Sequence, residues 1–237
     1  MPEMTSFPAS PPIRPLQKPV LFGLAAVTGI VDAVCYLGLG HVFTANMTGN
    51  VVLLGFAAAG VESLSVSRSV TALMAFLVGA VIGVRLARSM NPALHHWPAA
   101  AFGFEAALLF MSATAAASRW GGAPVASTGV YLIIALTGVA MGMRNATIRR
   151  LGEREVNTTV LTMTLTGIGA DSILAGGSNQ GELTRVGFVL SVFAGATAGA
   201  VLLRYSAALT LGIAGATSAV CAVAAFLTPS GLDRRGT

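Results

Sequence analysis

The sequence predicts an all-α, polytopic membrane protein with six full transmembrane helices and two shorter re-entrant or broken segments. Composition is the first reason: of 237 residues, 54% are hydrophobic and only 10% are charged, and the mean hydropathy is +0.77. A soluble domain carries roughly 25% charged residues, so this chain lacks the residues for a water-facing surface. The 28 glycines are the second reason, because membrane helices that approach closely need small residues. The third is a series of eight hydrophobic stretches, in which the first four resemble the last four.

The two ends of the chain, residues 1–19 and 229–237, are predicted to be cytoplasmic tails around one membrane domain at residues 20–228. The first tail is rich in proline, which predicts disorder. The next run, Val20–Gly40, is too long for a signal-peptide core and has no A-x-A-like cleavage site, so we interpret it as an uncleaved span. Basic cytoplasmic loops explain the net charge of +5, and we expect no nucleic-acid partner. Cys35 and Cys221 lie in apolar runs, which is typical of buried single thiols.

Six apolar runs are long enough to cross about 30 Å of hydrocarbon as helices. They are Val20–Gly40, Ser69–Leu86, Trp97–Ser118, Val125–Met143, Val186–Leu203 and Ala207–Leu227. Two further stretches are ambiguous. In Thr44–Gly60 only Val51–Gly60 is continuously apolar or small, and Val156–Ala170 is interrupted by threonines. Short apolar runs of this kind are typical of re-entrant or broken segments.

The distribution of Lys and Arg favours re-entrant segments over full crossings. If both ambiguous stretches enter and leave on one side, and the N-terminus is cytoplasmic, 11 basic residues lie inside and 3 outside. If both stretches cross, the split is 7 against 7. Cytoplasmic loops normally carry the excess of basic residues. We therefore expect six spans, two re-entrant elements and both termini in the cytoplasm.

An internal repeat relates residues 20–118 to residues 125–228. Three signatures recur in the same order. They are Thr28-Gly29 with Thr137-Gly138, FTANMTGN (43–50) with NTTVLTMT (157–164), and Gly79-x-x-x-Gly83 with Gly195-x-x-x-Gly199. Because three spans per half is an odd number, the second half is expected to be inverted, with the two short segments meeting near the membrane midplane. The glycine pairs predict close helix packing, within one chain or across a homodimer.

The short segments carry the main cluster of candidate site residues. Polar side chains inside a membrane are costly unless they are bonded. Either these residues only satisfy a broken backbone, or they line a solute pathway beside a helix N-terminus, which attracts anions and polar groups. Thr48 or Asn50 is expected to cap a helix that begins near Val51. The candidates are Thr44, Asn46, Thr48 and Asn50 in the first half, and Asn157, Thr158, Thr159 and Thr162 in the second.

Four further residues are candidates because ionisable or amide side chains are rare within membrane spans. Asp32 lies near the middle of the first span and marks a site, a proton relay or a buried bonded group. Glu105, in the third span, has the same interpretation with less force. Arg144 and Asn145 follow the fourth span. Arg144 either pairs with a carboxylate, binds an anion or extends its side chain to the interface, and its place near a helix end favours the last.

The motifs also resemble a known family. Gly29-Ile-Val-Asp32-Ala, then FTANMTGNVVLLG, then GMRNATIRRLG with a Thr-rich run are similar to the YoaK-like family, across nearly the whole chain after the N-terminal tail. The resemblance implies an uncharacterised multi-pass protein of the bacterial cytoplasmic membrane. It implies no established substrate. The family commonly has Gln where this chain has Arg144, so a shared neutral-amide role does not carry over to this position.

Three functions compete. The favoured hypothesis is a transporter or channel for a small polar or anionic solute, held near the midplane between the repeats. A membrane scaffold or sensor is the alternative. An intramembrane hydrolase is less favoured, since the sequence has no G-x-S-x-G, H-E-x-x-H or C-x-x-C motif, and Gly167-Ile-Gly-Ala-Asp171 only superficially matches an aspartyl protease motif. We expect no enzyme activity, cofactor or metal; the expected partners are the lipid bilayer and a small solute or ion.

Overall fold

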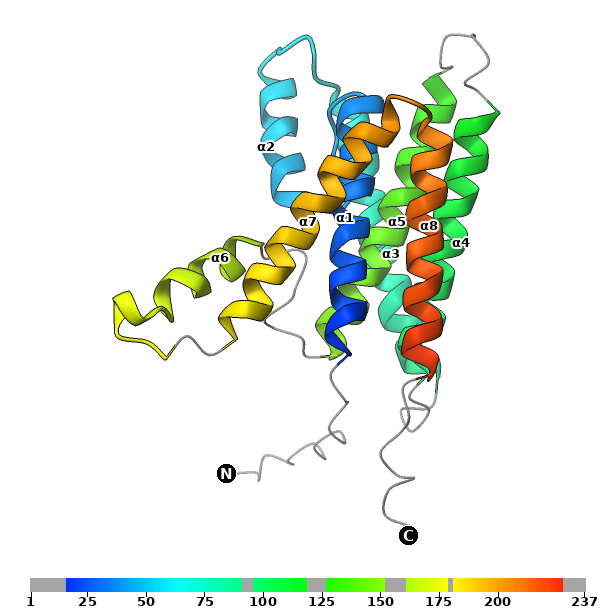
Figure 1. Cartoon of the computed structure of the whole chain (residues 1–237). Coiled ribbons are helices and arrows are strands. Elements are labelled where there is room, and N and C mark those ends of the chain that lie inside the picture. Colours follow the sequence, from blue (N-terminus) through cyan, green and yellow to red (C-terminus); the bar gives the residue numbers. More distant parts are fainter. Residues whose placement is uncertain (1–15, 91–95, 119–126, 152–160, 179–180, 228–237) are drawn as a thin grey trace, which may run out of the picture.

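The computed structural model describes residues 16–90, 96–118, 127–151, 161–178 and 181–227, and these residues form helices without any strand. Six helices are long and apolar enough to cross a membrane. They are α1 (Lys18–Gly38), α3 (Val66–Ser89), α4 (Trp97–Ala117), α5 (Ser127–Leu151), α7 (Glu182–Leu203) and α8 (Ala207–Leu227). The predicted all-α membrane fold with six long spans is therefore confirmed. Helix α1 begins, and α8 ends, at the same end of the bundle (Figure 1).

The two remaining α-helices are short. Helix α2 (Met47–Ala58) has 12 residues and α6 (Leu161–Ala170) has 10, and a 3₁₀ turn, η2 (Ile173–Ala175), follows α6. At about 1.5 Å per residue neither helix reaches across about 30 Å of hydrocarbon. Both lie on the α1–α7 side of the bundle, α2 beside its upper part and α6 extending away from its lower part (Figure 1). Helix α2 packs on α3, and α6 packs on α7.

Two predicted helix limits were wrong. The fourth span was expected to end at Met143, but α5 continues through Arg144 and ends at Leu151. Arg144 is buried inside the bundle, and the exposed Arg149 and Arg150 lie in the last turn, so the polar end of the helix comes later than the apolar run indicated. Helix α2 begins at Met47 rather than near Val51. Its N-cap is Asn46, whose side chain accepts a hydrogen bond from the Gly49 N–H at 3.3 Å.

Glycines fix how closely the long helices pack. The main helix pairs are α1 with α7, α3 with α5, and α4 with α8, and α1 also packs on α8 as α4 does on α5. A Cβ at Gly29 would collide with the α7 backbone at Val192 and Ala196, and one at Gly195 with the α1 backbone at Ala26. The α3–α5 pair repeats this arrangement, because a Cβ at Gly79 would collide with the backbone of Val139. These small-residue faces are therefore used inside the chain.

Candidate functional site

A cavity of about 530 Å³ lies where α1, α2, α6 and α7 meet. One face of α1 lines the cavity through Thr28, Asp32 and Tyr36. These residues are spaced four apart and so lie on the same side of the helix. The first turns of both short helices complete it, through Thr48 and Gly49 of α2 and Leu161 and Thr162 of α6. The full lining is Thr28, Asp32, Tyr36, Phe43, Ala45, Asn46, Thr48, Gly49, Val52, Leu53, Leu161, Thr162, Leu165 and Val192.

Asp32 fixes the chain segment that leads into α2. Its Oδ1 accepts hydrogen bonds from the backbone N–H groups of Thr44 and Ala45, both at 2.9 Å. These donors lie just before the N-terminus of α2, where free N–H groups attract negative charge. Both donors precede Asn46, the N-cap of α2, so they are not N–H groups of the first turn of the helix.

Asn50 closes the turn between Asp32 and α2. Its side-chain oxygen accepts from the Phe43 N–H at 2.9 Å, and its amide nitrogen donates back to the Phe43 carbonyl. The side chain is fully buried. Gly49 contributes by leaving room: a Cβ there would lie 2.9 Å from Cδ2 of Phe43. Asn50 and Gly49 therefore hold the Phe43 ring at the edge of the cavity.

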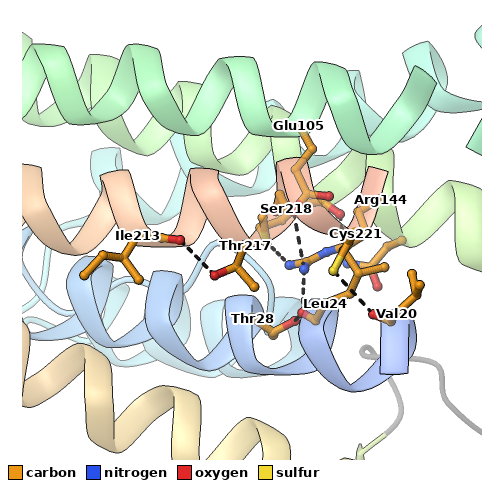
Figure 2. A network of polar contacts seen from close by, with 11 residues as sticks. Val20, Leu24, Thr28, Glu105, Arg144, Ile213, Thr217, Ser218 and Cys221 are labelled. Carbon is orange, nitrogen blue, oxygen red and sulfur yellow. Dashed lines mark hydrogen bonds and ion pairs between the residues drawn. The ribbon is translucent and has the colours of Figure 1, made fainter. Parts of the chain in front are cut away.

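A second polar cluster lies in the core between α1, α4, α5 and α8 (Figure 2). Arg144 Nη1 lies 3.4 Å from Glu105 Oε1, and neither side chain is exposed. Ser218 donates to the same Glu105 oxygen at 2.8 Å, and Arg144 Nη1 donates to the Leu24 carbonyl at 2.6 Å. Arg144 Nη2 also contacts the Met141 sulfur. Glu105 Oε2 and Arg144 Nε are buried without a hydrogen-bond partner among the described residues.

The two clusters share a stretch of α1. The Leu24 carbonyl that accepts from Arg144 also accepts from the Thr28 hydroxyl, at 3.1 Å. Thr28 lines the cavity, one helical turn from Asp32. Figure 2 shows Thr28 and Leu24 side by side beneath the Arg144 guanidinium. A single carbonyl of α1 thus accepts from a residue that lines the cavity and from the buried ion pair.

The structure brings some predicted residues to the cavity and places others elsewhere. Asp32, Asn46, Thr48 and Thr162 line it. Thr44 does not: it is fully buried, and its hydroxyl lies 3.5 Å from the Cys35 sulfur. Asn50 supports the turn before α2, and Glu105 and Arg144 form the separate ion pair. Asn145 donates to the Met141 carbonyl at 2.9 Å. The other candidates, Asn157, Thr158 and Thr159, lie outside the described residues.

The favoured interpretation of Arg144 was wrong. Its side chain does not extend to the interface; it points into the core and pairs with Glu105. A buried guanidinium needs a counter-charge and hydrogen-bond acceptors, and here it finds a carboxylate, a carbonyl and a sulfur. The alternative that Arg144 pairs with a carboxylate is the one the structure shows.

Three residues of the cavity and the buried polar cluster were not predicted as site residues from the sequence. Tyr36 could have been found, because it lies four residues after Asp32 on the same helix face. Ser218 had no local signal, since serine in an apolar helix commonly bonds its own backbone. Thr28 was noticed only as part of the repeat. Among the described residues, no group of three or more His, Cys, Asp or Glu side chains is arranged to hold a metal ion.

Comparisons with known proteins agree with this architecture. The model of the family described as "Protein of unknown function (DUF1275)" matches residues 20–224. The UPF0700 transmembrane protein YoaK of Bacillus subtilis (strain 168) is 39% identical over 145 residues, which cover 60% of this chain and 61% of that relative. No solved structure matches. The family match runs from the first turn of α1 into the last turns of α8. This multi-pass membrane protein therefore belongs to the DUF1275 family, which includes the YoaK-like transmembrane proteins.

Proposed function

We propose that this protein is a membrane transporter or channel for a small polar or charged solute, and that the cavity between α1, α2, α6 and α7 is the solute site. One observation carries the proposal. The first turns of two helices that are too short to span a membrane meet at a cavity of solute size, which is lined partly by polar side chains. Irregular backbone at membrane depth is tolerated where it is buried in protein or lines a water-filled cavity. Broken helices that start at a central site are the typical architecture of solute carriers.

The helix packing supports an inverted repeat as the framework of this transporter. Suppose that α1 to α4 correspond, in order, to α5 to α8. The contact between α1 and α7 then has the contact between α5 and α3 as its counterpart, and both contacts are present. The same holds for α1 with α8 and α5 with α4, and for α2 with α3 and α6 with α7. Such exchanged pairing gives two halves that can rock about a shared site. We place both termini in the cytoplasm and the protein in the bacterial cytoplasmic membrane.

The site argues against the two competing functions. An aspartyl hydrolase needs two carboxyl groups at one position. Asp171, the second candidate, is instead paired with Arg185 at 2.5 Å, and it does not line the Asp32 cavity. A scaffold without transport does not require a cavity of about 530 Å³ in which Asp32, Asn46 and Thr162 meet an apolar wall.

Reconstitution into liposomes tests the proposal directly. Stopped-flow swelling and tracer uptake are measured for small neutral, cationic and anionic solutes, with the wild-type protein, Asp32→Asn and empty liposomes. The expected result is flux of at least one solute class above empty liposomes, and a changed flux in Asp32→Asn. A matched control is Glu62→Gln, which neutralises an exposed carboxylate outside the cavity. Flux equal to empty liposomes for every solute class would remove the transport proposal.

A further inference from the structure

We infer that the cavity binds a small organic cation, an alkylammonium, with the charged head beside Asp32 and the alkyl part against the apolar wall. The inference deepens the proposed function by naming the class of solute, and it rests on that function for its physiological meaning. Binding can still be measured without transport, so the two claims can fail separately.

The first argument is charge. Among the described residues that line the cavity, Asp32 is the one charged side chain, and no Lys, Arg or His is present in the lining. The nearest buried guanidinium, Arg144, is directed to Glu105 and to the Leu24 carbonyl in the neighbouring cluster. A single carboxylate without a basic side chain in the same lining attracts a cation and repels an anion.

The second argument is that the two backbone N–H groups that precede α2 beside the cavity already bond a carboxylate. The backbone N–H groups of Thr44 and Ala45 donate to Asp32 Oδ1, both at 2.9 Å. An anionic solute would have to displace this oxygen while it remained beside the same negative charge. A cation instead meets a carboxyl group that backbone hydrogen bonds hold in place.

The third argument is the pair of aromatic rings next to Asp32. Tyr36 and Phe43 both line the cavity, and their rings stack with centroids 4.9 Å apart and planes 19° from parallel. Tyr36 lies one helical turn after Asp32 on the same face of α1. The π-electrons of aromatic rings attract ammonium groups, and a carboxylate beside aromatic rings is a recurring recognition site for organic ammonium.

The remaining lining selects for a solute with an apolar part. Val52, Leu53, Leu165 and Val192 form the wall contributed by α2, α6 and α7. A bare metal ion gains nothing from this wall. Ca²⁺ needs about six to eight oxygen ligands and Mg²⁺ about six, and the described lining offers one carboxyl group. An alkylammonium matches both the charged and the apolar halves of the cavity.

The test compares three ligands of similar size that differ in charge: n-butylammonium, n-butanol and n-butyrate. Binding to the full-length protein in nanodiscs is measured by isothermal titration calorimetry. The expected order of affinity is butylammonium, then butanol, then butyrate. Asp32→Asn should lower the butylammonium affinity at least about tenfold, because the counter-charge of the ammonium group is removed. It should leave the affinity for butanol unchanged, because Asn still accepts from the two N–H groups.

Two further variants keep the test decisive if Asp32→Asn does not fold. Phe43→Leu keeps an apolar side chain and removes the ring, so it should lower the butylammonium affinity about threefold and leave butanol unaffected. Glu62→Gln should change neither. Equal binding of butyrate and butylammonium, or butylammonium binding that survives both Asp32→Asn and Phe43→Leu, overturns the inference.

The liposome assay separates the two claims. Asp32-dependent binding of butylammonium without any flux leaves the cation site standing and removes the transport function. Flux of neutral or anionic solutes, with no binding or flux of butylammonium, keeps the transport function and removes the cation site.

Discussion

Arg144 of α5 and Glu105 of α4 form an ion pair with 3.4 Å between Nη1 and Oε1, and both side chains are completely buried. The pair is anchored on two more helices, through Ser218 of α8 and the Leu24 carbonyl of α1. Four of the six long helices therefore meet at one pair of charges. In such surroundings the removal of one charge leaves the other buried without a counter-charge.

Glu105→Gln is predicted to destabilise the protein strongly, by about 3–5 kcal/mol, because it leaves the Arg144 guanidinium unneutralised. Thermal unfolding in detergent, followed by circular dichroism, is the measurement. The double variant Glu105→Gln/Arg144→Gln should recover much of this loss, since no buried charge remains. Additive losses in the double variant would contradict a coupled pair.

A matched control is another ion pair among the described residues, Arg185 with Asp171, in which the carboxylate is 54% exposed. An exposed pair contributes about 0–1 kcal/mol, so Asp171→Asn should lower the unfolding temperature much less than Glu105→Gln. A loss as large as that of Glu105→Gln would mean that burial is not what makes the Arg144–Glu105 pair important.

Ser218→Ala should weaken the protein by about 1.5–3 kcal/mol, because Ser218 donates to a charged oxygen at 2.8 Å. Thr217→Val is its neighbour and control: the Thr217 hydroxyl bonds only the Ile213 carbonyl of its own helix, at 2.9 Å. Its loss should have little effect, since such back-bonding does not join helices. The two variants are compared by the same thermal unfolding measurement. Equal losses would show that Ser218 does not stabilise Glu105.

Glycine substitutions should separate sites of close packing from open ones. Gly29→Ala and Gly79→Ala place a methyl group against the backbone of the partner helix, at Val192 and Val139. Overpacking of this kind costs about 1–3 kcal/mol or more. The matched controls are Gly103→Ala and Gly212→Ala, helical glycines with nothing within 4 Å of the new Cβ. Unfolding temperature and membrane yield should fall only for the first two variants; a fall in all four would point to backbone flexibility instead of packing.

The sequence could predict part of the site because polar groups stand out in apolar surroundings. Asp32, Asn46, Thr48 and Thr162 were identified in this way, and all four line the cavity. Pairing between helices could not be predicted, because it depends on which faces meet in three dimensions. The partners of Glu105 were therefore not predicted. The end of the fourth span was predicted at Met143, although α5 continues and the next residue, Arg144, is buried. The cap of α2 was misplaced because Thr48, Asn50 and Asn46 are all good caps, and Asn50 is used by Phe43.

Cysteine labelling tests whether α2 and α6 are re-entrant. With re-entrant segments and a cytoplasmic N-terminus, the loop after α2 lies outside and the turn after α6 lies inside; if both stretches crossed, both would lie inside. Glu62 and Leu174 are suitable reporters, because both are exposed and Leu174 is 100% exposed. The native Cys35 and Cys221 are buried, which keeps the background low. In right-side-out vesicles an impermeant maleimide should label Glu62→Cys but not Leu174→Cys, and inverted vesicles should give the opposite result. Labelling of both positions in inverted vesicles only would instead mean two full crossings, and labelling of both in right-side-out vesicles would mean that α6 alone crosses; either result would contradict two re-entrant segments that meet at the midplane.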